Sequence, residues 1–206
     1  MGTIKTVFCW TGGVILPAIP DITIQLLQSK HNHNVDFWLR KSIRELAEKL
    51  FIGKLDGRSY CRAVIEKAGG SSSAEDLEAA HLREATLKES ILAVLAELPS
   101  IYQIWLISDY PPDWFRPISA QLTPFPFVHA ERVIFTKELG LTNLVPDIIP
   151  QLTRSARQPM EACMVVDGDP RRAVEAVKHG LSSAILIDSF RLRREFGLRK
   201  MLSASN

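Results

Sequence analysis

The segment Ile4–Leu16 constrains the fold more than any other part of this chain. Its first half is a β-branched and aromatic run of the length of a buried strand. Gly12 and Gly13 follow at once, where the chain can turn tightly and bring backbone N–H groups close to a ligand. Open α/β sheets bind their ligands at the carboxyl ends of the strands. The segment therefore predicts a sheet strand that ends in a binding turn.

Further apolar runs of strand length follow along the chain, and segments with helical periodicity separate them. We expect the second to fifth strands at Tyr102–Ile107, Arg132–Thr136, Ala162–Val166 and Ser183–Ile187. Strands that alternate with helices are typical of a parallel sheet with helices on both faces. The predicted class is α/β, with a Rossmann-like parallel sheet as the core.

Residues 18–87 interrupt this alternation directly after the first strand. They hold no strong strand pattern, and their apolar side chains recur at helical spacing. Several side chains have the composition of helix N-caps; these are Asp21, Asp56 or Ser59, Ser73 and, just beyond the block, Ser90. We therefore expect an α/β core made of residues 1–17 and 88–206, with a small all-helical cap, residues 18–87, inserted after the first strand.

Composition excludes several classes of partner. A net charge of +2 is too small to indicate nucleic-acid binding. No apolar run approaches the roughly 18 residues of a membrane span, and the N-terminus lacks a signal-peptide pattern. Cys9, Cys61 and Cys163 are scattered without metal-ligand spacing, which favours reduced thiols. We predict a cytoplasmic protein, a monomer or homodimer, whose ligand is an unidentified small molecule or protein.

The Ile4–Leu16 segment resembles the first motif of the haloacid dehalogenase (HAD) superfamily of phosphatases and dehalogenases. That motif commonly reads Phe-Asp-x-Gly-Gly-Val-Leu, and its aspartate is the nucleophile. Aligning Gly12 and Gly13 with the two glycines of the family puts Trp10 at the nucleophile position. We favour this register because turn geometry constrains glycines more tightly than packing constrains a phenylalanine.

A second register aligns Phe8 with the phenylalanine of the family. It puts Cys9 at the nucleophile position and Thr11 at the second acidic position. Neither register supplies a carboxylate.

The resemblance extends to the second and third motifs of the family. Ser108 ends a strand where the family binds the phosphoryl group, and Asp109 stands where relatives often have Asn. With the N–H groups of Gly12 and Gly13, these residues are the expected anion-binding set. The third motif of the family supplies a lysine, often as Gly-x-x-Lys-Pro. Asn143 takes that place in Gly140–Asn143, and Lys137 is a nearby alternative cation.

The fourth motif pairs two acids that hold Mg²⁺. The segment Met164–Pro170 resembles it, with Asp167 kept and Gly168 in place of the second acid. The resemblance therefore implies Mg²⁺ at Asp167, with Asp169 as a second candidate ligand, while the lost acid argues against the metal. Asp169 also has the composition and position of an N-cap for a helix that starts at Pro170.

The resemblance thus joins a HAD-like fold to degenerate catalytic motifs. The nucleophilic aspartate, the lysine and one metal-binding acid act as a set, and their losses are strongly non-additive. We expect a catalytically inactive protein with a binding or regulatory role. One alternative is an active phosphatase or dehalogenase-type hydrolase of a small phosphorylated or halogenated metabolite, with Cys9 as a nucleophile. Another is a scaffold that uses exposed aromatic side chains at Tyr110, Trp114 and Phe115.

Overall fold

The computed structural model describes residues 4–30, 34–70, 72–98, 101–141 and 147–186 of the chain. Within these residues, parallel strands form one five-stranded sheet with the order β3-β2-β1-β4-β5. The strands are β1 (Thr6–Trp10), β2 (Gln103–Ser108), β3 (Val133–Phe135), β4 (Cys163–Asp167) and β5 (Ser183–Leu186). The predicted α/β class is therefore confirmed, while Ile187, the expected end of the last strand, lies outside the described residues.

β1 is the central strand, and all five of its residues are buried. Strands of parallel sheets are covered on both faces, which explains why this segment reads as a continuous apolar run. Cys9 pairs with Leu106 of β2 and with Val166 of β4. This register brings together the carboxyl ends of three strands, where Trp10, Ser108 and Asp167 are the last residues.

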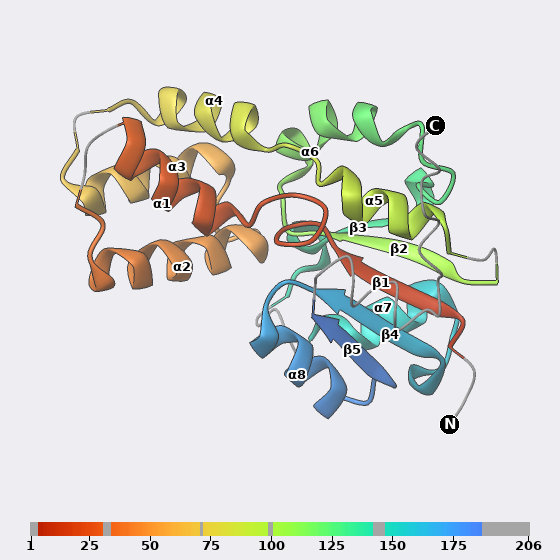
Figure 1. The fold of residues 1–206 in the computed structure, drawn as a ribbon. Helices are drawn as coiled ribbons and strands as arrows, with labels where there is room; N and C mark the ends of the chain where they lie inside the picture. The colour runs from red at the N-terminus through yellow and green to blue at the C-terminus, as the bar shows by residue number, and fades with distance from the viewer. Residues whose placement is uncertain (1–3, 31–33, 71, 99–100, 142–146, 187–206) are drawn as a thin grey trace.

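The chain between β1 and β2 is helical, as predicted. Its helices are α1 (Ile19–Lys30), α2 (Phe37–Phe51), α3 (Gly57–Ala68), α4 (Ala74–Glu84) and α5 (Glu89–Ala96). Helices α1 to α4 pack on one another and lie beyond the carboxyl ends of the strands, whereas α5 lies alongside the sheet (Figure 1). The helical insertion after β1 is thus confirmed, and its boundaries at residues 18 and 87 stay predictions.

Two of the predicted N-caps are present. The carboxylate of Asp56 accepts a 2.7 Å hydrogen bond from the backbone N–H of Ser59 at the start of α3. The hydroxyl of Ser73 accepts a 3.0 Å bond from the N–H of Asp76 at the start of α4. These bonds satisfy backbone donors that have no partner within the helix.

The caps expected at Asp21 and Ser90 are wrong. Helix α1 begins at Ile19, so Asp21 lies in its first turn, where an acidic side chain still favours the positive end of the helix dipole. Helix α5 begins at Glu89, with Lys88 as an N-cap residue that makes no side-chain capping bond.

The second half of the chain supplies the remaining described helices. They are α6 (Pro112–Ser119), α7 (Ile148–Ala156) and α8 (Pro170–Lys178), with short 3₁₀ segments between β2 and β4. The expectation of exposed aromatic side chains here is wrong, because Tyr110, Trp114 and Phe115 are only 1–2% exposed. They belong to the buried apolar cluster that joins the inserted helices to the sheet. Among the described residues, no helix has the length and apolar character needed to cross a membrane.

Candidate functional site

Trp10 and Arg172 form the centre of the candidate site. Trp10 ends β1 with only 2% of its surface exposed. The guanidinium carbon of Arg172, from the first turns of α8, lies 4.2 Å from the centre of the Trp10 ring. A cation at this distance from an indole is attracted by the negative face of the ring. Sequence reasoning did not select Arg172, although its place five residues after Asp167 is the signal that could have found it.

Arg172 pairs with two buried carboxylates. Its Nε and Nη2 atoms donate to the two oxygens of Asp167 at 2.9 and 2.8 Å, a bidentate arrangement. Its Nη1 atom lies 3.4 Å from Oδ2 of Asp109. The Arg172 side chain is 15% exposed, and those of Asp109 and Asp167 are 2% and 0% exposed. Burial disfavours the charged guanidinium, but the two carboxylates outweigh burial and raise the pKa of Arg172.

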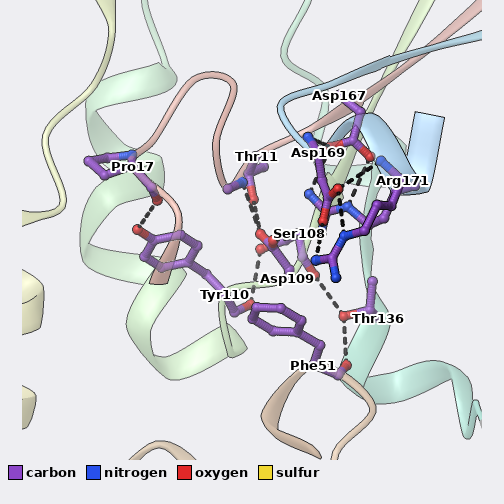
Figure 2. Close-up of polar contacts among 12 residues, drawn as sticks. Thr11, Pro17, Phe51, Ser108, Asp109, Tyr110, Thr136, Asp167, Asp169 and Arg171 are labelled. Atoms are coloured by element: carbon purple, nitrogen blue, oxygen red, sulfur yellow. Dashed lines mark hydrogen bonds and ion pairs between the residues drawn. The ribbon is translucent and has the colours of Figure 1, made fainter. Parts of the chain in front are cut away.

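Asp109 occupies the donors that were predicted to hold an external anion. Its Oδ1 atom accepts hydrogen bonds from the N–H of Gly12 at 2.9 Å and from the hydroxyl of Thr11 at 3.2 Å. Figure 2 shows the Asp109 carboxylate directed at this turn. A Cβ atom on residue 12 would lie 2.5 Å from the same carboxylate, so the approach requires glycine. The turn binds a carboxylate of its own chain.

Gly13 adopts a φ of +83°, and its carbonyl accepts a 3.0 Å hydrogen bond from Nζ of Lys88. Burial lowers the pKa of this lysine, and Asp21 opposes the shift. Lys88 is therefore a cation at the edge of the turn that sequence reasoning missed. Of the predicted cations, Lys137 lies in the 3₁₀ segment Thr136–Leu139, and the lysine-position residue Asn143 lies outside the described residues.

The remaining predicted residues have partners within the protein. The hydroxyl of Ser108 donates to the carbonyl of Tyr110 at 3.0 Å. Asp169 is the N-cap of α8, as its composition suggested, and accepts from the N–H of Arg171 at 2.8 Å. It also pairs with the guanidinium of Arg171 at 3.0 Å (Figure 2). Its own N–H donates to Asp167 at 2.9 Å, so the Asp167 carboxylate has three donors.

Cys9 is fully buried one residue before Trp10. Successive side chains of a strand point to opposite faces of the sheet, so Cys9 faces away from the side on which Trp10 meets Arg172. Burial, and to a smaller extent Asp167, raises the pKa of the Cys9 thiol. A thiol that stays protonated is a poor nucleophile.

No protein-family model matches the sequence, and no curated protein matches it. Solved structures do match. A HAD family enzyme from Bacteroides thetaiotaomicron aligns with a TM-score of 0.67 and 14% identity, over 91% of this chain and 95% of that enzyme. The chain has the HAD fold. The L-2-haloacid dehalogenase from Xanthobacter autotrophicus, with chloropropionic acid covalently bound, aligns with a TM-score of 0.65 and 17% identity, over 95% of this chain and 83% of the dehalogenase. At these identities the likeness shows the fold alone.

Magnesium is the metal that the HAD fold implies, because the Bacteroides enzyme has been solved in complex with magnesium and inorganic phosphate. The residues of this chain do not fit the ion. Mg²⁺ needs several oxygen ligands in octahedral geometry, whereas the oxygens of Asp109 and Asp167 already bind Arg172 and backbone or hydroxyl donors. In the part of the chain that the structure describes, no group of three or more His, Cys, Asp or Glu side chains could hold a metal.

Proposed function

We propose that this chain is a HAD-fold protein without hydrolytic activity, which acts by binding a small molecule or a protein. The observation that carries the proposal is the pairing of Trp10 with Arg172 at the end of β1. In the favoured register, the residue at the nucleophile position is an indole, which has no lone pair available for attack on phosphorus or carbon.

The charge balance of the site also supports the proposal. Phosphoryl transfer relies on cations that face the transferring group. Here the cation at the strand ends, Arg172, is already neutralised by Asp109 and Asp167. The N–H of Gly12 and the hydroxyl of Thr11, which could face a bound anion, donate to Asp109 instead.

The alternative is a phosphatase or dehalogenase-type hydrolase that uses the Cys9 thiol as its nucleophile. The burial of Cys9, its raised pKa and its position on the opposite face from Arg172 count against that alternative. The variant Cys9→Ser separates the two proposals, because it would abolish a thiol-dependent activity and leave a binding function intact.

The test is hydrolysis of an aryl phosphate, of a panel of small phosphate esters and of 2-chloropropionate, each with Mg²⁺. We expect wild type to match a protein-free control. Trp10→Asp restores a carboxylate at the nucleophile position, and Trp38→Asp, on an exposed side chain, controls for the added charge. Slow turnover by Trp10→Asp alone would support the register, whereas turnover by wild type would overturn the proposal.

A further inference from the structure

We infer that the Arg172 guanidinium takes the place of a divalent cation between Asp109 and Asp167 and makes this site independent of metal. The inference stands apart from the proposed function, because metal binding and turnover are measured separately. A protein without turnover could still bind Mg²⁺, and a metal-independent site could still take part in a reaction of another kind.

The first argument is geometric. Asp109 and Asp167 come from the ends of β2 and β4, on either side of β1, and Arg172 contacts both of them. The guanidinium reaches Asp167 through two hydrogen bonds of 2.9 and 2.8 Å and Asp109 through one contact of 3.4 Å. A planar fork with five donors matches a carboxylate bidentately, which a lysine could not do.

The second argument concerns desolvation. Two carboxylates as buried as Asp109 and Asp167 cannot remain charged side by side without a neighbouring cation. Arg172 supplies that charge from within the chain, and its ring contact with Trp10 holds the guanidinium in place. A metal ion that displaced Arg172 would leave a buried, unpaired guanidinium, which is strongly unfavourable.

The third argument is the set of donors to the carboxylate oxygens. Oδ1 of Asp167 accepts from Arg172 and from the N–H of Asp169, and Oδ2 accepts from Arg172. Oδ1 of Asp109 accepts from the turn at Thr11 and Gly12, and Oδ2 faces Arg172. Each oxygen therefore has a partner, and Mg²⁺, which loses its hydration water reluctantly, gains little by replacing them.

The inference predicts that removing the guanidinium uncovers a cation site. The experiment is calorimetric titration of the full chain with Mn²⁺ and with Mg²⁺. We expect no measurable binding to wild type and at least about tenfold tighter Mn²⁺ binding to Arg172→Gln. Arg171→Gln is the matched control, because Arg171 is the exposed neighbour that pairs with Asp169, and it should behave as wild type. Adding Asp167→Asn to Arg172→Gln should abolish the gained binding.

Each result decides the inference. Binding of Mn²⁺ or Mg²⁺ by wild type that is lost in Asp167→Asn would overturn it, since the ion would then share the site with Arg172. A folded Arg172→Gln that binds no better than wild type would also overturn it. If Arg172→Gln is too unstable for calorimetry, its urea midpoint is measured with and without Mn²⁺. A bound ion raises the midpoint by mass action, and an unchanged midpoint counts against the inference.

Discussion

Arg171 and Arg172 are neighbours on α8 with opposite surroundings. The Arg171 side chain is 73% exposed and pairs with Asp169, whereas Arg172 is 15% exposed and pairs with Asp109 and Asp167. Removing one partner of a buried ion pair leaves an unpaired charge inside the protein, while an exposed pair is screened by water. The same substitution should therefore have different effects at these two positions.

We predict that Arg172→Gln lowers the free energy of unfolding by about 3–5 kcal/mol, and that Arg171→Gln lowers it by about 1 kcal/mol or less. Urea denaturation followed by circular dichroism measures both values. Equal losses for the two variants would contradict the view that Arg172 neutralises the buried carboxylates.

Residue by residue, the sequence predicts the short-range features well. The caps at Ser73 and Asp169 were predicted from their own neighbours, because a capping bond spans only two or three residues. The pairing of Arg172 with Asp109 joins residues 63 positions apart and depends on the sheet order. Spacing alone does not carry that information, so Arg172 was missed while the two carboxylates were found.

At the level of elements, β1 and its turn were predicted because a buried run and two glycines act locally. The environment of α6 was not predicted. Trp114 and Phe115 follow a strand end and precede polar residues, a pattern that suggested exposure. They are buried because the helical insertion covers them, and the position of that insertion over the sheet is a tertiary feature.

His81 lies in α4 and packs against helices α1 and α3. Its Nε2 atom lies 3.0 Å from Oγ1 of Thr23, and its ring meets Tyr60 edge-on and stacks on Trp114. Trp114 in turn donates to Glu78 at 2.8 Å. Burial lowers the pKa of His81 from 6.5 to about 3. The folded protein therefore holds this imidazole neutral.

This shift predicts a loss of stability in acid. Between pH 6.5 and about 3, the unfolded chain binds a proton at His81 that the folded chain excludes. The free energy of unfolding should therefore fall as the pH falls below 6.5, by up to about 1.4 kcal/mol per pH unit from this group. His81→Gln should flatten the dependence measured by urea denaturation from pH 7 to pH 5. His179→Gln, at a 40% exposed histidine, should leave it as in wild type.

Across the whole molecule, the inserted helices meet the core at Trp114. This side chain extends from α6 and is 2% exposed. A Cβ atom on Gly57, the first residue of α3, would lie 2.4 Å from its Nε1 atom, so helix and indole are in direct contact. With the stack on His81 and the hydrogen bond to Glu78, Trp114 joins α6 to both α3 and α4.

A single buried indole that joins two groups of elements should couple their local stabilities. Truncating a buried tryptophan to alanine costs about 3–5 kcal/mol, and here most of the lost contacts lie between α6 and the inserted helices. We predict that Trp114→Ala speeds amide hydrogen exchange in α3 and α4 far more than in β1. Trp38→Ala, at a side chain that is 68% exposed, should leave exchange in these elements unchanged. Equal acceleration in β1 and in the inserted helices would mean that the molecule opens only as one unit, because local openings that bypass the core expose some elements before others.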